Sequence, residues 1–328
     1  MTTAVDRTSE QKIRPRARAW LVWTAALVVL AAGAVLAWWI PYRPVRVVGA
    51  RPLPGPYTLP APRTGLRLHV FNTGVNRMSP LLVGANPPWR PAPAFVIEHP
   101  REGLVVFDMG LSEAVAQHGE AALPAPMRWL FASRGRVGRT LAAQMREAGL
   151  EPTAVRWVIV SHLHADHIGA EPAFAAATFV GGAGASAHHF ETGFAPLWRE
   201  VDFAHGQPLA PFDATVDLFG DGSILLIRGG GHAREDVMAL LALPGGPALL
   251  AGDAVVHSEW LRSDDVERIA TDPARAADVR NQVRALVDTV PALVLLPGHD
   301  LRQLPGDRAD LIPHHREWFE PAAWPIDE

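Results

Sequence analysis

Several apolar runs in this chain end at once in histidine or aspartate, and this pattern restricts the fold more than any other feature. The segment SHLHADH (161–167) follows the apolar run WVIV (157–160), and three later apolar runs lead, beside glycine, to His232, Asp253 and His299. Glycine at a strand end lets the backbone turn sharply, so the side chain can be aimed at a shared point. The sequence therefore predicts several strands that end at one edge of the molecule, around a common site.

The side chains at these positions are of the types that bind zinc, iron or manganese. His162 and His164 are two residues apart, so they point to the same side of an extended chain, and Asp166 and His167 occupy the turn that follows. The chain has no cysteine, which excludes thiolate ligands, thiolate nucleophiles and disulfides. A lone histidine is more often structural than a ligand, but four such sites at strand ends together favour a metal centre.

Beyond residue 65 the chain alternates strand-like and helix-like segments, which indicates an α/β fold built in layers. Apolar runs between turn residues predict strands at 66–74, 93–100, 103–110, 155–160, 177–182, 222–229, 237–243, 248–253 and 292–300. The spacing of apolar residues predicts helices at 137–150 and 272–290. Many of these strands are apolar throughout, as in sheets that are covered on both faces.

The first 64 residues predict a membrane anchor and a spacer. Residues 19–40 carry no charged side chain, and a helix of that length spans about 33 Å, enough to cross a bilayer. Residues 1–18 are basic, so we expect the N-terminus in the cytoplasm and the rest outside it. A cleaved signal peptide, which would give a secreted protein, is the alternative. Residues 41–64 contain seven prolines and predict a semi-rigid linker before one domain at 65–328.

The charged residues exclude some classes of function. The formal net charge is −4, so nucleic acid is not an expected partner. The single lysine, Lys12, precedes the predicted domain, which excludes Schiff-base and phosphate-loop lysine chemistry there. The expected partners are a small-molecule substrate and, through residues 19–40, the membrane. The oligomeric state is not predicted.

The motifs at the strand ends resemble, in order and spacing, those of the metallo-β-lactamase-fold hydrolases. They are FDMG with Asp108, SHLHADH (161–167), GGGH with His232, GD with Asp253 and PGHD with His299. The likeness covers about residues 65–305 and is greatest to the N-acyl-homoserine lactonase branch. It implies a four-layer αββα sandwich, with two mixed sheets face to face, helices outside and the site at one edge.

The resemblance also implies two divalent metal ions, with zinc expected and iron or manganese as alternatives. By the family pattern, one metal would be held by His162, His164 and His232, and the second by Asp166, His167 and His299, with Asp253 bridging. Asp108 would orient a ligand histidine. A hydroxide shared by the metals would attack the substrate, and Asp253 or Asp166 would give a proton to the leaving alkoxide.

The expected substrate is a lactone or a related carboxylic ester. Asp253 and the absence of cysteine argue against a β-lactamase, and the tail after His299 is too short for a glyoxalase-type thioesterase. Lactonases of this family commonly carry a tyrosine shortly after the bridging aspartate, whereas this chain has none beyond Tyr57. His257 is the candidate replacement as a proton donor, with a plain loop histidine as the alternative. A phosphotriesterase or arylesterase on the same fold, and a non-catalytic binding protein, are the rival functions.

Overall fold

The structure, a computed structural model, describes residues 14–39, 45–46, 53, 55–79, 88–125, 127–190, 192–263, 265–266 and 269–326. The chain divides into two compact units, Met1–Pro44 and Val45–Glu328. The first unit contains one helix, α1 (Arg14–Trp39), which overlaps the predicted membrane span at 19–40. Within the described residues, however, no helix combines the length and the apolar character that a membrane crossing requires. The predicted membrane anchor is therefore not supported. The predicted location of the domain outside the cytoplasm stays a prediction. Residues 1–13 of the predicted basic segment lie outside the described residues.

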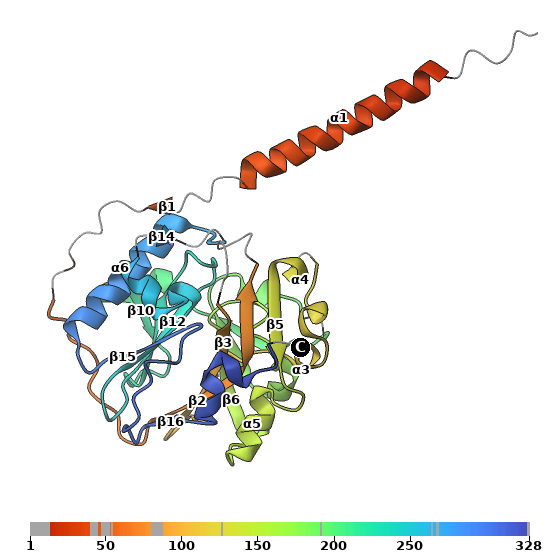
Figure 1. The fold of residues 1–328 in the computed structure, drawn as a ribbon. Helices are drawn as coiled ribbons and strands as arrows, with labels where there is room; N and C mark the ends of the chain where they lie inside the picture. The colour runs from red at the N-terminus through yellow and green to blue at the C-terminus, as the bar shows by residue number, and fades with distance from the viewer. Residues whose placement is uncertain are drawn as a thin grey trace, which may run out of the picture. The chain divides into compact units, whose positions relative to one another are not determined.

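The second unit is built around two mixed β-sheets (Figure 1). The larger sheet has, in spatial order, β16 (Leu311–Pro313), β2 (Arg67–Met78), β3 (Arg90–His99), β4 (Gly103–Phe107), β6 (Val155–Ile159), β7 (Thr178–Gly181) and β8 (Leu197–Glu200), with β5 (Phe131–Gly135) also paired to β2. The smaller sheet has β15 (Val294–Pro297), β13 (Ala248–Gly252), β12 (Val237–Leu241), β11 (Ile224–Arg228), β10 (Phe212–Asp217) and β9 (Gln207–Leu209). A separate short sheet pairs β1 (Val45–Arg46) with β14 (Asp265–Val266).

Side chains that alternate along the strands form one core between the two sheets and one on each outer face. In β12, Val237, Ala239 and Leu241 belong to the core that both sheets share, whereas Met238 and Leu240 belong to the outer core of the smaller sheet. This alternation explains why both faces of the strand are apolar, as the sequence indicated.

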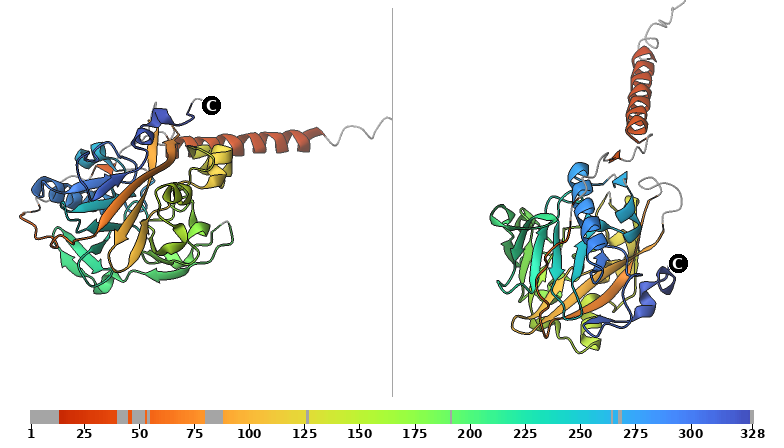
Figure 2. Two further views of the ribbon diagram at one scale, coloured as in Figure 1. Left: turned by 90° about the horizontal axis from the view of Figure 1, so that it is seen from below. Right: turned by 90° about the vertical axis from the view of Figure 1, so that its left-hand side faces the viewer.

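Helices cover the outer faces of both sheets. On the smaller sheet, α6 (Pro273–Thr289) buries Val279, Val283 and Leu286 in the outer core, and Figure 2 shows it lying along these strands. On the larger sheet, α5 (Leu141–Glu147) buries Leu141 and Met145. Two short helices, α3 (Glu113–His118) and α4 (Met127–Leu130), lie between β4 and β5 in the chain. The predicted sandwich of two mixed sheets with helices outside is confirmed.

The predicted strands and helices are present with shifted ends. The helix predicted at 137–150 begins only at Leu141, after a turn, and ends at Glu147. The sequence did not predict β5, β8, β9, β10 or β16. The strands β8, β9 and β16 have four residues or fewer, and β5 and β10 contain charged residues among few apolar ones. The predicted linker also differs from the structure: Tyr57 and Leu59 pack against the core beneath α6, and the Arg63 amide donates a hydrogen bond to the Ala242 carbonyl at 2.7 Å. The compact unit therefore includes residues before Gly65.

The topology brings the carboxyl ends of two parallel strand pairs to one edge. In the larger sheet β4 and β6 run parallel, with Phe107 opposite Ile159, and in the smaller sheet β13 and β15 run parallel, with Gly252 opposite Pro297. At this edge the Val237 amide donates a hydrogen bond to the Ser161 carbonyl at 2.9 Å, which joins the two sheets. Six of the seven predicted metal ligands follow β6, β13 and β15, and Asp108, the predicted orienting residue, follows β4.

Truncating a side chain in the core between the two sheets should lower the stability of the protein. Leu226→Ala removes a fully buried side chain from this core, so we expect the free energy of unfolding to fall by about 2–5 kcal/mol. Leu197→Ala, at a leucine that is 71% exposed, should change it by less than about 0.5 kcal/mol. Urea unfolding followed by circular dichroism measures both, and equal effects would contradict the assigned core.

Candidate metal centre

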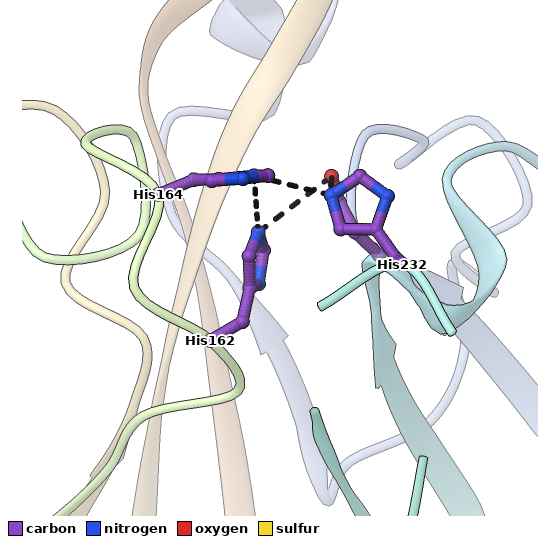
Figure 3. Close-up of side chains that lie close together, drawn as sticks. His162, His164 and His232 are labelled. Carbon is purple, nitrogen blue, oxygen red and sulfur yellow. Dashed lines mark hydrogen bonds and ion pairs between the residues drawn. The ribbon is translucent and has the colours of Figure 1, made fainter. Parts of the chain in front are cut away.

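Three imidazoles from both sheets form the first cluster (Figure 3). His162 and His164 follow β6, and His232 follows β11. The Nδ1 atom of His164 lies 2.8 Å from His162 Nε2 and 3.1 Å from His232 Nε2. Three nitrogens bound to one zinc ion at about 2.0–2.1 Å in tetrahedral geometry would lie about 3.3–3.4 Å apart. The three nitrogens are therefore close to the positions that one shared ion requires.

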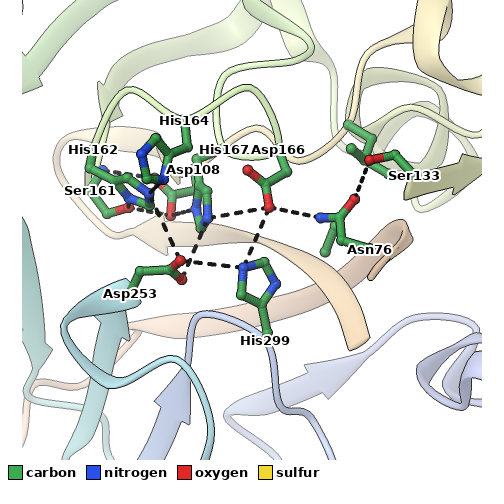
Figure 4. A network of polar contacts seen from close by, with 12 residues as sticks. Asn76, Asp108, Ser133, Ser161, His162, His164, Asp166, His167, Asp253 and His299 are labelled. Carbon is green, nitrogen blue, oxygen red and sulfur yellow. Dashed lines mark hydrogen bonds and ion pairs between the residues drawn. The ribbon is translucent and has the colours of Figure 1, made fainter. Parts of the chain in front are cut away.

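The second cluster consists of Asp166, His167 and His299 (Figure 4). The Oδ2 atom of Asp166 lies 3.4 Å from His299 Nε2 and 3.9 Å from His167 Nε2. Asp166 and His167 come from the turn after β6, and His299 follows β15. Like the first cluster, it combines residues that follow a strand of the larger sheet with a residue that follows a strand of the smaller sheet.

Asp253, at the end of β13, lies between the two clusters. Its Oδ2 atom is 3.4 Å from both His232 Nε2 and His299 Nε2, and its Oδ1 atom is 3.6 Å from His167 Nε2. One carboxylate thus faces imidazoles of both clusters, as a bridging ligand must. The structure brings together all seven residues that the sequence predicted as ligands.

The charges of the groups fit a cation site. Burial lowers the pKa of His162 well below its ordinary value and that of His232 to about 4, so both imidazoles are neutral and can bind a metal. Burial acts to raise the pKa of Asp253, but the neighbouring His299 and His167 lower it well below its usual value. Burial also acts to lower the pKa of His167, yet the carboxylates of Asp108 and Asp166 raise it to about 10. This increase reflects the negative potential that these carboxylates create where a cation would lie, since a proton and a metal ion compete for the same imidazole. In the ligand set itself, the carboxylates supply the negative charge that two divalent ions need.

Three of the ligand imidazoles are oriented by hydrogen bonds of the ring nitrogen that faces away from the site. In His162 this Nδ1 atom lies 3.0 Å from Ser161 Oγ. His167 donates from Nδ1 to Asp108 Oδ2 at 2.8 Å, and His299 donates from Nδ1 to the Pro91 carbonyl at 2.8 Å. Asp108 also accepts hydrogen bonds from the amide and the hydroxyl of Ser161, both at 2.7 Å. These contacts hold Asp108 in a left-handed backbone conformation, with φ 56°, that is uncommon for residues other than glycine. Asp108 lies where the sequence predicted an orienting residue.

Glycine at 298 makes room for the bridging carboxylate. A Cβ atom at this position would lie 1.9 Å from Asp253 Oδ1, far closer than any contact allows. Gly252 is required for a second reason, since its φ of 48° is left-handed and a Cβ atom there would lie 2.8 Å from Ser161 Cβ. The glycines beside these ligands in the sequence thus allow the close approach of β13, β15 and the Ser161 turn.

Unsatisfied polar atoms mark the space that a cation would fill. Among the described residues, His167 Nε2 and Asp253 Oδ1 are buried and have no hydrogen-bond partner, although they lie 3.6 Å apart. Buried polar groups without partners are rare in proteins. A cation among these atoms would satisfy both, so the residues fit the two metal ions that the family pattern implies.

An apolar pocket opens directly above the clusters. His164, Asp166, Asp253 and His299 form its floor, and its apolar walls consist of Met78, Pro88, Leu111, Leu123, Met127, Phe131, Ala165 and Ile269. The space between these side chains, counted together with the open solvent at its mouth, is about 720 Å³. A bound molecule would therefore have its reacting group against the ligands and its apolar part against the walls.

His257 lies outside both clusters and outside the residues that line this pocket. Its Nε2 atom is 2.9 Å from Arg302 Nη2 and 3.6 Å from Asp300 Oδ2, and its Nδ1 atom is 3.3 Å from the Glu259 amide. Burial and the neighbouring Arg302 also lower its pKa. Because both ring nitrogens are engaged by these neighbours, the geometry gives no support to His257 as the proton donor.

The sequence reasoning missed two polar residues of the site. Asn76 in β2 donates from Nδ2 to Asp166 Oδ2 at 2.7 Å, and Ser133 in β5 donates from Oγ to Asn76 Oδ1 at 2.7 Å. Both residues line the pocket. Asn76 lies within a long strand and β5 was not predicted, so no local pattern in the sequence pointed to either residue.

Comparison with known proteins agrees with this geometry. The sequence model of the Metallo-beta-lactamase superfamily matches residues 87–299. The N-acyl homoserine lactonase AttM of Azorhizobium caulinodans is 28% identical over 228 residues, which are 64% of this chain and 82% of that protein. The N-acyl homoserine lactonase AttM of Rhizobium johnstonii is 30% identical over 182 residues, and the match covers 50% of this chain and 65% of that protein.

A solved structure has the same fold. It is an N-acyl homoserine lactone hydrolase with the product N-hexanoyl-L-homoserine bound at its catalytic metal centre. Its chain is 18% identical to this one and superposes with a TM-score of 0.60 over 72% of this chain and 94% of its own.

Because Gly298 is closely packed against Asp253, adding a single methyl group at this position should reduce metal binding. Gly298→Ala places a methyl group against Asp253 Oδ1, so we expect bound zinc, measured by elemental analysis after dialysis, to fall well below that of the unaltered protein. Gly306→Ala is the control, because the nearest atom to its added methyl would be 3.4 Å away, at the end of an arginine side chain. Unchanged zinc in Gly298→Ala would contradict the bridging position of Asp253.

Proposed function

The chain belongs to the metallo-beta-lactamase superfamily, and on that premise we propose that this hydrolase uses two metal ions to open a lactone or a related carboxylic ester. The observation that carries the proposal is the carboxylate of Asp253 between two ligand clusters at the floor of an apolar pocket. The names of the two AttM relatives, both N-acyl homoserine lactonases, support the choice of a lactone.

The seven clustered residues would hold the metals. His162, His164 and His232 would bind one ion, His167, His299 and Asp166 the other, and Asp253 both. Histidine and carboxylate ligands suit zinc, with iron or manganese as alternatives. Bound there, two divalent ions would supply Lewis acidity and lower the pKa of a water molecule that they share.

The pocket determines how the substrate is placed. Its floor is polar and its walls are largely apolar, so an ester carbonyl would lie near the clusters while an apolar substituent lies along Leu111, Leu123 and Phe131. Apolar walls exclude water from the bound substituent and favour substrates that carry an acyl or aryl group.

Asp166 is the carboxylate best placed to pass a proton to the leaving alkoxide. It lines the pocket, and its side chain is 22% exposed, so it is accessible to the reacting group. The Asp253 side chain is 6% exposed and faces imidazoles on both sides, which suits a ligand that stays ionised. The proton-transfer role that the sequence gave to either aspartate is therefore proposed for Asp166.

His164→Ala tests the site directly. We expect it to abolish hydrolysis, because it removes the nitrogen that faces both other imidazoles of the first cluster. The domain should stay folded, since His164 is only half-buried and not part of a core. His189→Ala, at an exposed histidine, is the control. Circular dichroism verifies folding, and retained turnover in His164→Ala would refute the proposed site.

A substrate panel tests the reaction class. The zinc-loaded protein should hydrolyse N-acyl lactones with kcat/KM well above that for a thioester, a β-lactam, an aryl ester and a phosphotriester. A preference for the phosphotriester or the aryl ester would replace the lactone with that substrate class. No turnover of any of them by protein that holds two zinc ions would favour a binding protein.

A further inference from the structure

The three ligands of the second cluster are each held by one partner. Asp108 holds His167 and the Pro91 carbonyl holds His299. The carboxylate of Asp166 has a different kind of partner, the side-chain amide of Asn76, whose Nδ2 atom lies 2.7 Å from Asp166 Oδ2 (Figure 4). Among the described residues, this is the one side-chain hydrogen bond that the structure gives to Asp166.

Asn76 is itself fixed by Ser133. The two residues lie directly opposite each other in the antiparallel pair of β2 and β5, and both are more than nine-tenths buried. The Ser133 hydroxyl donates to Asn76 Oδ1 at 2.7 Å. This contact determines which way the amide faces, because the reverse orientation would put the Asn76 carbonyl against the carboxylate of Asp166.

The oxygen that accepts from Asn76 is also the oxygen that faces the second cluster. Asp166 Oδ2 lies 3.4 Å from His299 Nε2 and 3.9 Å from His167 Nε2. A carboxylate oxygen has two lone-pair directions, so it can accept from Asn76 along one and face a cation along the other. Without Asn76, the partly exposed Asp166 side chain would rotate more freely, and fixing it on a metal would carry an entropic penalty.

We propose that Asn76, held by Ser133, is a positioning residue that sets the affinity of the second cluster for its metal ion. The inference rests on the metal centre of the proposed function and adds residues that the ligand motifs do not contain. The structure gives neither residue a hydrogen bond to His162, His164 or His232, so the first cluster should keep its affinity. Through Ser133, the strand β5 thus influences metal affinity at the second cluster, although β5 itself contains none of the seven ligands.

Metal titration of the 328-residue chain tests the inference. Apoprotein is titrated with zinc against a competing chelator, and separately with cobalt, whose absorption spectrum reports its ligands. We expect two binding steps in the unaltered protein. In Asn76→Ala the step of the first cluster should be unchanged, and the step of the second cluster should weaken about 10–100-fold, as is typical when a partner of a metal ligand is removed. The cobalt spectrum assigns each step, because the first cluster offers three imidazoles and the second a mixed set of ligands. Asn281→Ala, which removes an amide on α6, is the control and should match the unaltered protein.

Ser133 variants separate positioning from a general structural effect. Ser133→Ala should weaken the second step alone, and Ser133→Thr, which keeps a hydroxyl, should restore it. The double variant should match Asn76→Ala, because Ser133 acts only through Asn76. Two outcomes would overturn this inference and leave the proposed function standing. One is unchanged metal affinity in Asn76→Ala, and the other is an equal loss of affinity at both steps together with a lower melting temperature of the apoprotein. Fewer than two metal ions in the unaltered protein would overturn it together with the proposed function.

Discussion

The shared position of Asp253 is the constraint on which the rest of the site depends. The Asp253 carboxylate lies 3.4–3.6 Å from imidazoles of both clusters. A buried charge of this kind is tolerated only when it is paired with an opposite charge or binds a metal. The backbone is shaped around it: a side chain at Gly298 would occupy the place of Oδ1, and Gly252 turns the chain in a conformation that favours glycine. Four of the six other ligands lie within 4 Å of this carboxylate: His162, His167, His232 and His299.

The fold supplies this arrangement because each sheet contributes a parallel strand pair to the same edge. The pair β4 and β6 carries Asp108 and the SHLHADH turn, and the pair β13 and β15 carries Asp253 and His299. The hydrogen bond from Val237 to the Ser161 carbonyl links the two sheets at this edge. A rigid sandwich with a continuous core between its sheets therefore holds ligands from distant parts of the sequence within a few ångströms.

The sequence was informative where a local pattern reflects a physical need. Apolar runs long enough to be buried on both faces predicted β6, β12 and β13, and glycine beside His232, Asp253 and His299 marked the close approach that the site requires. It was uninformative where the structure depends on distant pairing. Ser133 and Asn76 come together only through the register of β2 and β5, and Arg302 from another segment contacts His257. In the proline-rich segment, Tyr57 and Leu59 pack against the core of the smaller sheet. For the apolar segment 19–40, the composition predicted a membrane span, and within the described residues no helix is long and apolar enough to support it.

The central claim is that the seven residues hold two metal ions that share Asp253, and anomalous X-ray scattering from zinc-loaded crystals tests it most directly. Data collected on both sides of the zinc absorption edge should show two peaks, each about 2.0–2.2 Å from its ligand atoms, with Asp253 in contact with both. A single peak, or two peaks of which Asp253 touches only one, would contradict the account.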